Sequence, residues 1–428
     1  MAMVVLFAGC SEESRQRGES RSPGQPSGRS APESTDSKRA DESPSAAPVA
    51  PATKGPISPK RREKLDGFLD RIQFLDHVGP DLELREIEYT SRTDAVAMFL
   101  DPRAGNEGTV IATTDDNWAH ATRMYISDAL AYLVYYSPLG GGAVAVRPQQ
   151  QDPYINYPAF VLYPNGKTKP LRVLEPQARG RGDVLLDLDR WGSIFGGLGD
   201  VQTRQLWAAD VDAAEIYPVE GTRFGEVWKH VPGRRGAIVS VQGFKRRGQQ
   251  WRFETSSDRG RTWTTTEADL PGGRSTGGPG FGYGQAGVAV GPGHLQATVS
   301  TQWLQDLPSY VNALWQTDDE QRFHQVPLPW DRPYFGGIAY ADDGALLFGR
   351  LFVSDIPCSK PICGPPGEIW RYAPGSRVPE PLAGAPSLLG PYWSGGIDTS
   401  GGVIIARTGV RTISVSSDGY HWTPVTPG

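Results

Sequence analysis

Short apolar runs separated by polar turns fill the chain from about residue 82 to its end. Each run is bounded by Gly, Pro, Asn or Asp, the residues that favour turns. This pattern predicts many short β-strands and few helices. The chain has no internal run of the roughly 18 apolar residues that a membrane-spanning helix needs, so the sequence excludes such a span.

Residues 62–76 are the one segment with clear helical spacing. Its apolar positions recur three or four residues apart: Leu65, Phe68, Leu69, Ile72 and Leu75. We expect a short helix that packs on the domain and marks its beginning. A face that binds a partner or a membrane is the alternative.

Two segments share a turn motif: residues 256–263 read SSDRGRTW and residues 416–422 read SSDGYHW. The motif resembles the Asp-box, or bacterial neuraminidase repeat, of sialidase-like β-propellers. In such a hairpin the Asp accepts hydrogen bonds from backbone amides, the Gly takes a positive φ, and the Trp folds back between blades. The residues that carry the motif are structural: Ser256, Asp258, Gly260, Trp263, Ser416, Asp418, Gly419 and Trp422.

Weaker copies of the turn extend the repeat along the chain. Together with positions 258 and 418 they make seven turns, the others falling at 115, 165, 210, 318 and about 374. The mean step is about 50 residues, and a four-stranded propeller blade takes roughly 40 to 50. A second repeat, of Gly-turn hairpins with an inner strand, begins at 287, 337 and 396. We therefore expect an all-β fold: a β-propeller, with seven four-stranded blades over residues 82–428. Six blades, or a β-sandwich, are the alternatives.

The amino terminus predicts where the protein resides. Residues 6–10 read LFAGC and resemble the lipobox of bacterial lipoproteins, which implies that Cys10 carries a lipid. The apolar stretch is short and no Lys or Arg precedes it, so we take residues 1–10 as the remnant of a signal peptide whose start lies upstream. Residues 11–61 contain no aromatic residue and no Leu, which predicts a disordered linker. Residues 62–81, the helix and lead-in, would then begin a head outside the bacterial cell membrane.

Composition and charge limit the kinds of partner that the protein can be expected to bind. The 52 Gly and 37 Pro suit the many turns, and the net charge of −5 offers no basic surface for nucleic acid. Cys358 and Cys363 lie between prolines, which favours a local disulfide over two free thiols. Two Cys cannot complete a tetrahedral metal shell, and the six His show no paired ligand spacing. We expect no metal or cofactor, and a monomer that touches the membrane only through its lipid.

Catalytic residues are harder to assign. The sialidase resemblance implies three Arg, an Asp acid/base and a Tyr nucleophile, but the motif that carries the first Arg is absent. Asp187 and Asp189 follow the strand 184–186 and are weak candidates for a carboxylate pair. Solvation of a rim explains them more simply.

Aromatic and glycine-rich segments supply the binding candidates. We expect these segments to precede or begin the inner strands of their blades and to converge at one mouth of the central channel. The candidates are Arg190, Trp191, Phe281, Tyr283, Arg332, Tyr334, Tyr392 and Trp393. They could stack on sugars or grip a peptide, or they could pack between blades. The sequence thus predicts a membrane-anchored binding or scaffold protein for a glycan, peptide or protein. A sialidase-like glycoside hydrolase is the alternative.

Overall fold

A computed structural model describes most of the chain beyond residue 57, and every structural statement below concerns the described residues. They are 58–100, 108–131, 133–149, 158–180, 183–186, 207–220, 227–232, 238–242, 250–256, 262–269, 285–292, 296–303, 310–319, 321–330, 335–351, 365–389 and 396–427. Within these ranges we find no helix with the length and apolar character needed to cross a membrane.

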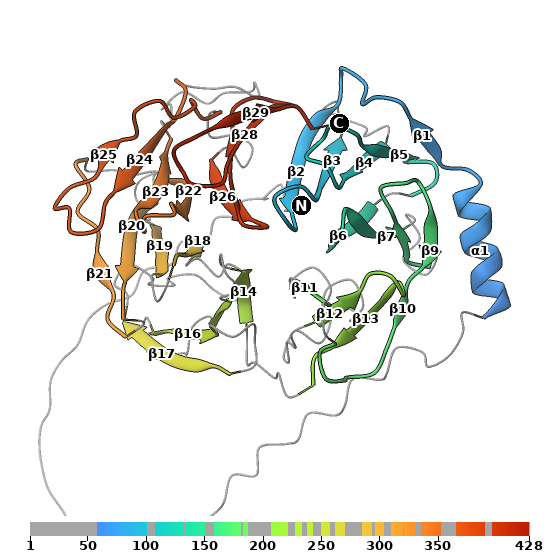
Figure 1. The fold of residues 1–428 in the computed structure, drawn as a ribbon, viewed down its shortest axis with the longest axis horizontal. Helices are drawn as coiled ribbons and strands as arrows, with labels where there is room; N and C mark the ends of the chain where they lie inside the picture. Colours follow the sequence, from blue (N-terminus) through green and yellow to red (C-terminus); the bar gives the residue numbers. More distant parts are fainter. Residues whose placement is uncertain are drawn as a thin grey trace, which may run out of the picture. The chain divides into compact units, whose positions relative to one another are not determined.

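Seven sheets follow one another along the described chain and are arranged around a common centre (Figure 1). Six of them contain four strands, and the first contains five. Neighbouring strands are antiparallel with one exception, described below. The protein is therefore an all-β propeller of seven blades, as the turn spacing predicts. The β-sandwich and six-blade alternatives are excluded.

The first blade has an additional outer strand. It consists of β1 (Gln73–Leu75), β2 (Glu83–Tyr89), β3 (Ala95–Leu100), β4 (Gly108–Thr114) and β5 (Thr122–Ser127). The helix α1 (Pro59–Leu69) precedes it. The prediction of a helix to residue 76 was wrong at its end, because Phe74 pairs with Met124 in the sheet. Leu65 and Phe68 are buried in an apolar cluster shared by the first and second blades, with the Phe68 and Phe160 ring centroids 6.1 Å apart.

The second blade consists of β6 (Leu133–Gly140), β7 (Ala143–Gln149), β8 (Phe160–Leu162) and β9 (Thr168–Pro170). The third blade departs from the regular pattern. The third consists of β10 (Arg172–Val173), β11 (Val184–Leu186), β12 (Trp207–Asp210) and β13 (Glu215–Pro218). Here β10 lies outermost and pairs in parallel with β13, so the first strand in sequence is not the innermost.

The last four blades are regular, with the first strand at one end of the sheet and the fourth at the other. The fourth blade consists of β14 (Val227–Pro232), β15 (Ile238–Gln242), β16 (Gln250–Ser256) and β17 (Thr264–Asp269). The fifth consists of β18 (Gln285–Val290), β19 (Gln296–Trp303), β20 (Tyr310–Thr317) and β21 (His324–Gln325). The sixth consists of β22 (Phe335–Tyr340), β23 (Leu346–Arg350), β24 (Glu368–Tyr372) and β25 (Glu380–Pro381). The seventh consists of β26 (Ile397–Ser400), β27 (Val403–Arg407), β28 (Ile413–Ser416) and β29 (Thr423–Val425).

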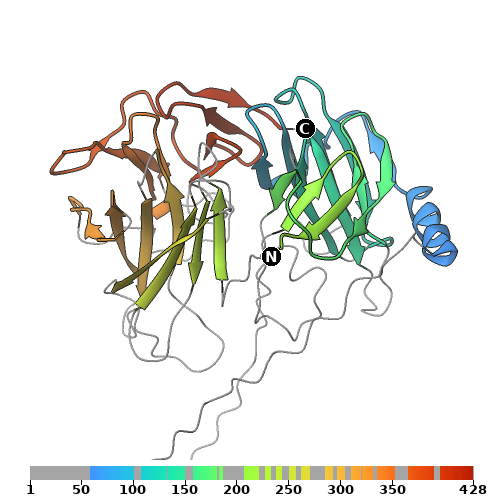
Figure 2. The ribbon, with the colours of Figure 1, turned by 60° about the horizontal axis from the view of Figure 1, so that its bottom comes forward.

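This strand order gives the propeller two rims. In the regular blades the turns between the first and second strands and between the third and fourth strands lie at the same end, which we call the hairpin rim. Connections between the second and third strands, and from one blade to the next, lie at the opposite end, which we call the loop rim. The sixth and seventh blades agree in direction, because the backbone N–H of Asp342 in one hairpin donates to the backbone carbonyl oxygen of Asp418 in the other (3.1 Å). Figure 2 shows strands of neighbouring blades side by side.

Small residues allow the inner strands of the sixth and seventh blades to approach closely. Gly337 has a φ of +97°, and a Cβ there would clash with the carbonyl oxygen of Ile397. A Cβ at Gly396 would clash with the carbonyl oxygen of Gly336. The glycines at the start of these inner strands therefore serve packing near the centre.

Candidate functional site

The binding and catalytic candidates of the sequence lie outside the described residues. They are Asp187, Asp189, Arg190, Trp191, Phe281, Tyr283, Arg332, Tyr334, Tyr392 and Trp393. Cys10, Cys358 and Cys363 also lie outside them, as do Asp258 and Gly260 of the first turn motif. These assignments remain predictions, and the described strands tell us only where the flanking chain lies.

Described strands that follow three of the candidate segments begin at one rim. The inner strands β18, β22 and β26 all begin at the loop rim, directly after the segments at 281–283, 332–334 and 392–393. The Trp191 segment comes after β11 in the chain, and residues 187–206 lie outside the described residues. Val184 pairs with Ala209 next to the hairpin at Asp210, so β11 runs from the hairpin rim towards the loop rim.

A cluster of four side chains lies at the loop rim of the sixth blade: Trp330, Arg350, Glu368 and Trp370. Arg350 ends β23 and Glu368 begins β24, and the two residues are directly paired in the sheet. Trp370 is on β24, and Trp330 precedes β22. We call this set the tryptophan–arginine cluster.

The guanidinium of Arg350 is held by the two indole rings. It lies 4.5 Å from the ring centroid of Trp330 and 5.6 Å from that of Trp370. The two indoles meet edge to face, with centroids 4.5 Å apart and an interplanar angle of 70°. A cation within about 6 Å of an indole face is attracted by the ring quadrupole, so the rings fix the direction of this side chain.

The carboxylate of Glu368 completes the cluster. It accepts a hydrogen bond of 3.0 Å from Nε1 of Trp370 and lies 3.7 Å from a terminal nitrogen of Arg350. The side chains of Arg350 and Glu368 are 28% and 47% exposed. The cluster therefore presents an oriented donor group, an oriented acceptor group and aromatic surface together at the rim.

Sequence reasoning did not name any of the four residues of this cluster as a binding candidate. Arg350 and Glu368 stand at the ends of the strands that flank the insertion containing Cys358 and Cys363, whereas Trp370 lies inside β24. Arg350 closes the apolar run at 346–348, and Glu368 opens the next run. Charged residues at both ends of an insertion at the loop rim were the available signal.

The hairpin rim uses its carboxylates within its own turns. Asp116, Asp319 and Asp418 each follow a Ser or Thr by two residues and receive its hydroxyl hydrogen bond, at 2.9 to 3.0 Å. Each also accepts backbone N–H groups from the residues that follow; His120 and His421 donate to Asp116 and Asp418 at 2.8 and 2.9 Å. The turns at 115 and 318 were therefore predicted correctly, although the accepting carboxylates are one residue later.

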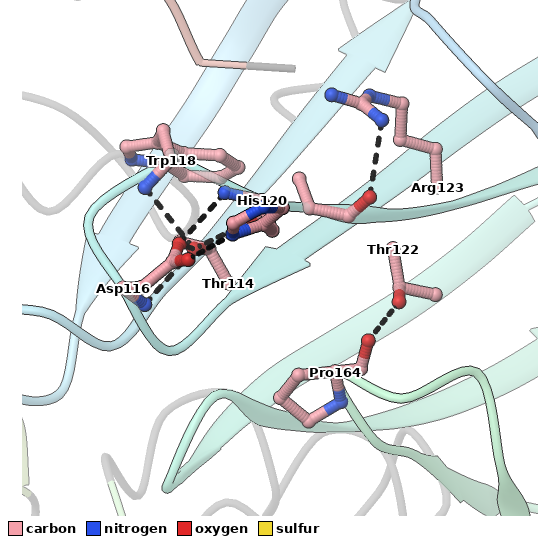
Figure 3. Close-up of polar contacts among 8 residues, drawn as sticks. Thr114, Asp116, Trp118, His120, Thr122, Arg123 and Pro164 are labelled. Carbon is pink, nitrogen blue, oxygen red and sulfur yellow. Dashed lines mark hydrogen bonds and ion pairs between the residues drawn. The ribbon is translucent and has the colours of Figure 1, made fainter.

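Two of these turns also hold a histidine ring. Nδ1 of His120 lies 2.6 Å from Asp116, and Nδ1 of His421 lies 2.5 Å from Asp418 (Figure 3 shows the first). Both imidazoles are 92% exposed. The described residues contain no group of three or more His, Cys, Asp or Glu side chains placed to hold a metal ion.

The tryptophans that follow the turns pack against the preceding blade. Trp263 contacts buried residues of the third blade, and Trp422 contacts those of the sixth and seventh. Trp118 lies in the cluster that joins the first and seventh blades. Gly419 has the expected positive φ of +93°. These residues act in packing, as the sequence predicts for this motif.

One hairpin-rim group resembles a catalytic arrangement in its residue types. Tyr420 donates to Asp343 at 2.7 Å and accepts a hydrogen bond of 2.9 Å from Nε of Arg371. Burial, followed by the bond to Asp343, raises the pKa of Tyr420. Asp343 and Arg371 belong to the sixth blade and Tyr420 to the seventh, so these hydrogen bonds join the two blades.

Comparison with known proteins found distant structural likenesses. No protein-family model and no curated protein sequence matches it. The β-propeller domain of the Trilobed protease from Pyrococcus furiosus is 11% identical over 82% of this chain and 96% of that chain, with a TM-score of 0.41. The GH74 enzyme of Niastella koreensis is 10% identical over 81% and 66%, with a TM-score of 0.33. The virginiamycin B lyase of Staphylococcus aureus is 12% identical over 83% and 88%, with a TM-score of 0.29.

Proposed function

We propose that this propeller is an extracytoplasmic binding protein, held at the bacterial membrane by a lipid on Cys10, that binds its ligand at the loop rim. The observation that carries the proposal is the tryptophan–arginine cluster, whose polar groups are oriented and partly exposed. Binding sites combine aromatic surface with a few placed polar groups in this way. Three of the aromatic segments predicted to bind are followed by strands that begin at the same rim.

The two rims differ in how their polar groups are used. At the hairpin rim, Asp116, Asp319 and Asp418 accept several hydrogen bonds from their own turns. Those bonds stabilise hairpins, and a ligand would have to replace them. At the loop rim, Glu368 is oriented by an indole N–H while nearly half of its side chain stays exposed. This contrast favours the loop rim as the binding face.

The proposal is tested with the full chain and a panel of three probes: neutral polysaccharides, acidic polysaccharides and a random peptide library. We expect Trp370→Ala to weaken binding of the retained probe by about 30-fold, the effect of losing a ~2 kcal/mol aromatic contact. Tyr420→Phe, at the hairpin rim, is the control and should bind normally. Equal binding by wild type and Trp370→Ala would contradict the proposal. Release of reducing ends from a bound polysaccharide would instead favour the glycoside hydrolase alternative.

The anchor is tested separately in cells that express the complete gene. Cys10→Ala should move the protein from the membrane fraction to the soluble fraction, because no acyl chain could then be attached. Cys358→Ala is the matched control and should stay with the membrane. Membrane fractionation that is unchanged in Cys10→Ala would refute lipid anchoring and leave the loop-rim proposal standing.

A further inference from the structure

We infer that the ligand of the tryptophan–arginine cluster is a neutral glycan, bound through one pyranose ring with adjacent hydroxyl groups. The inference rests on the proposed function, since it names the ligand class of the same site. Three properties of the cluster support it: the aromatic surface, the pairing of donor with acceptor, and the balance of charge.

The aromatic surface fits one side of a sugar ring. A pyranose with mostly equatorial hydroxyls exposes a face of C–H groups, which is apolar and slightly positive. An indole face is apolar and slightly negative because of its quadrupole. Trp330 and Trp370 are both partly exposed, and their ring planes are inclined at 70°. The exposed parts of the two indoles therefore supply aromatic surface beside Arg350 and Glu368.

The polar groups match sugar hydroxyls in kind. Each hydroxyl can donate one hydrogen bond and accept others, so two adjacent hydroxyls are best met by one donor group and one acceptor group side by side. Arg350 and Glu368 are such a pair: a terminal guanidinium nitrogen lies 3.7 Å from a carboxylate oxygen, and the two residues are directly paired on neighbouring strands. The carboxylate of Glu368 accepts hydrogen bonds and the guanidinium of Arg350 only donates them, so the donor and acceptor positions of the pair are fixed.

Charge selects against acidic ligands. The cluster contains one guanidinium and one carboxylate, so it presents no net charge. A uronate or sulfate that approached Arg350 would also approach Glu368, and close like charges repel. A neutral sugar meets no such repulsion. Because the indoles already fix Arg350 and Trp370 fixes Glu368, little side-chain freedom is lost on binding.

The test measures binding of the neutral polysaccharide probes to the full chain by affinity electrophoresis and titration calorimetry. Glu368→Gln keeps the shape of the side chain and removes its charge, and we expect it to weaken binding roughly tenfold or more, the effect of losing a hydrogen bond to a charged group. Trp370→Phe keeps an aromatic ring and removes the N–H that orients Glu368, and it should weaken binding severalfold. Circular dichroism establishes that each variant is folded.

The sixth blade supplies a matched control. Arg371 and Glu380 form another Arg–Glu pair, 3.4 Å apart, beside Tyr420 at the hairpin rim. Glu380→Gln makes the same chemical change as Glu368→Gln and should leave glycan binding unchanged. A loss of equal size in both variants would overturn the inference.

The outcomes separate the ligand class from the proposed function. Binding of a neutral polysaccharide that Glu368→Gln and Trp370→Phe both weaken supports the inference. Binding of only an acidic polysaccharide or a peptide, weakened by Trp370→Ala, overturns the neutral glycan and keeps the loop rim as the binding face. Binding that no cluster variant changes overturns both. Failure of every neutral probe to bind overturns the inference.

Discussion

Asp116 shows how one side chain can close a hairpin. The hydrogen bond from the backbone N–H of His120 lowers the pKa of Asp116 the most, followed by the hydrogen bond from the ring of the same residue. The pKa of Asp116 is held at about 2. Its hydroxyl partner, Thr114, also accepts the backbone N–H of Trp118 at 3.1 Å. Burial alone would raise the pKa of Asp418, but the hydrogen bonds that its carboxylate accepts from His421 and Tyr420 lower it. The ionised carboxylate is therefore the form that the folded turn selects.

This preference predicts a pH dependence at the acid end. The pKa of Asp116 is about 2 in the folded protein and about 3.9 in an unfolded chain. Its contribution to stability is complete above about pH 4 and is lost as the pH falls through 2, because the unfolded state binds the proton more tightly. We expect Asp116→Asn to flatten the decline in unfolding free energy between these values, measured by urea denaturation at several pH values. Asp115→Asn removes a charge from the adjacent position, and an equally flat curve for it would contradict this explanation.

At the scale of elements, the sequence predicts the turns that repeat from blade to blade and does not predict the features that occur once. The turns between third and fourth strands recur because a hydroxyl residue and an Asp two positions later close the hairpin locally, as in Ser416 and Asp418. By contrast, β1 and β10 pair with strands distant in the chain, so no local pattern marks them. The tryptophan–arginine cluster was missed for the same reason. Arg350 and Glu368 meet only because β23 and β24 pair across an insertion.

Contacts between neighbouring blades can also be tested. Arg371 of the sixth blade donates to Tyr420 of the seventh and to Asp343, and Tyr420 itself donates to Asp343. Tyr420→Phe should lower the free energy of unfolding by about 1 kcal/mol, the net value of a hydrogen bond. In the Tyr420→Phe variant, Arg371→Met should then lower the free energy of unfolding by less than it does in the wild type. Strictly additive effects in this double-mutant cycle, measured by urea denaturation, would show that the three residues do not act together.

At the scale of the whole propeller, the ring is closed by side chains and loops. The strands of the first blade all come from residues 73–127, and those of the seventh from residues 397–425. Among the described strands neither blade contributes to the sheet of the other. The junction consists of a shared apolar cluster and a few polar contacts. Arg407 donates to the carbonyl groups of Leu84 and Arg85, and Leu84 donates its N–H to Val410.

Ser400 offers the sharpest test of this junction. Its hydroxyl accepts the backbone N–H of Tyr89 at 3.0 Å and donates to the carbonyl oxygen of the same residue at 2.7 Å. Ser400→Ala would leave both backbone groups without this partner, and the cost of one unsatisfied buried group is about 1 to 3 kcal/mol. The apolar cluster should still hold the blades, so we expect local opening before global unfolding. Hydrogen exchange of the Tyr89 amide should accelerate by roughly tenfold or more while that of Phe348, in the middle of the sixth blade, stays near the wild-type rate. Uniform acceleration at both amides would mean that the junction unfolds together with the rest of the ring.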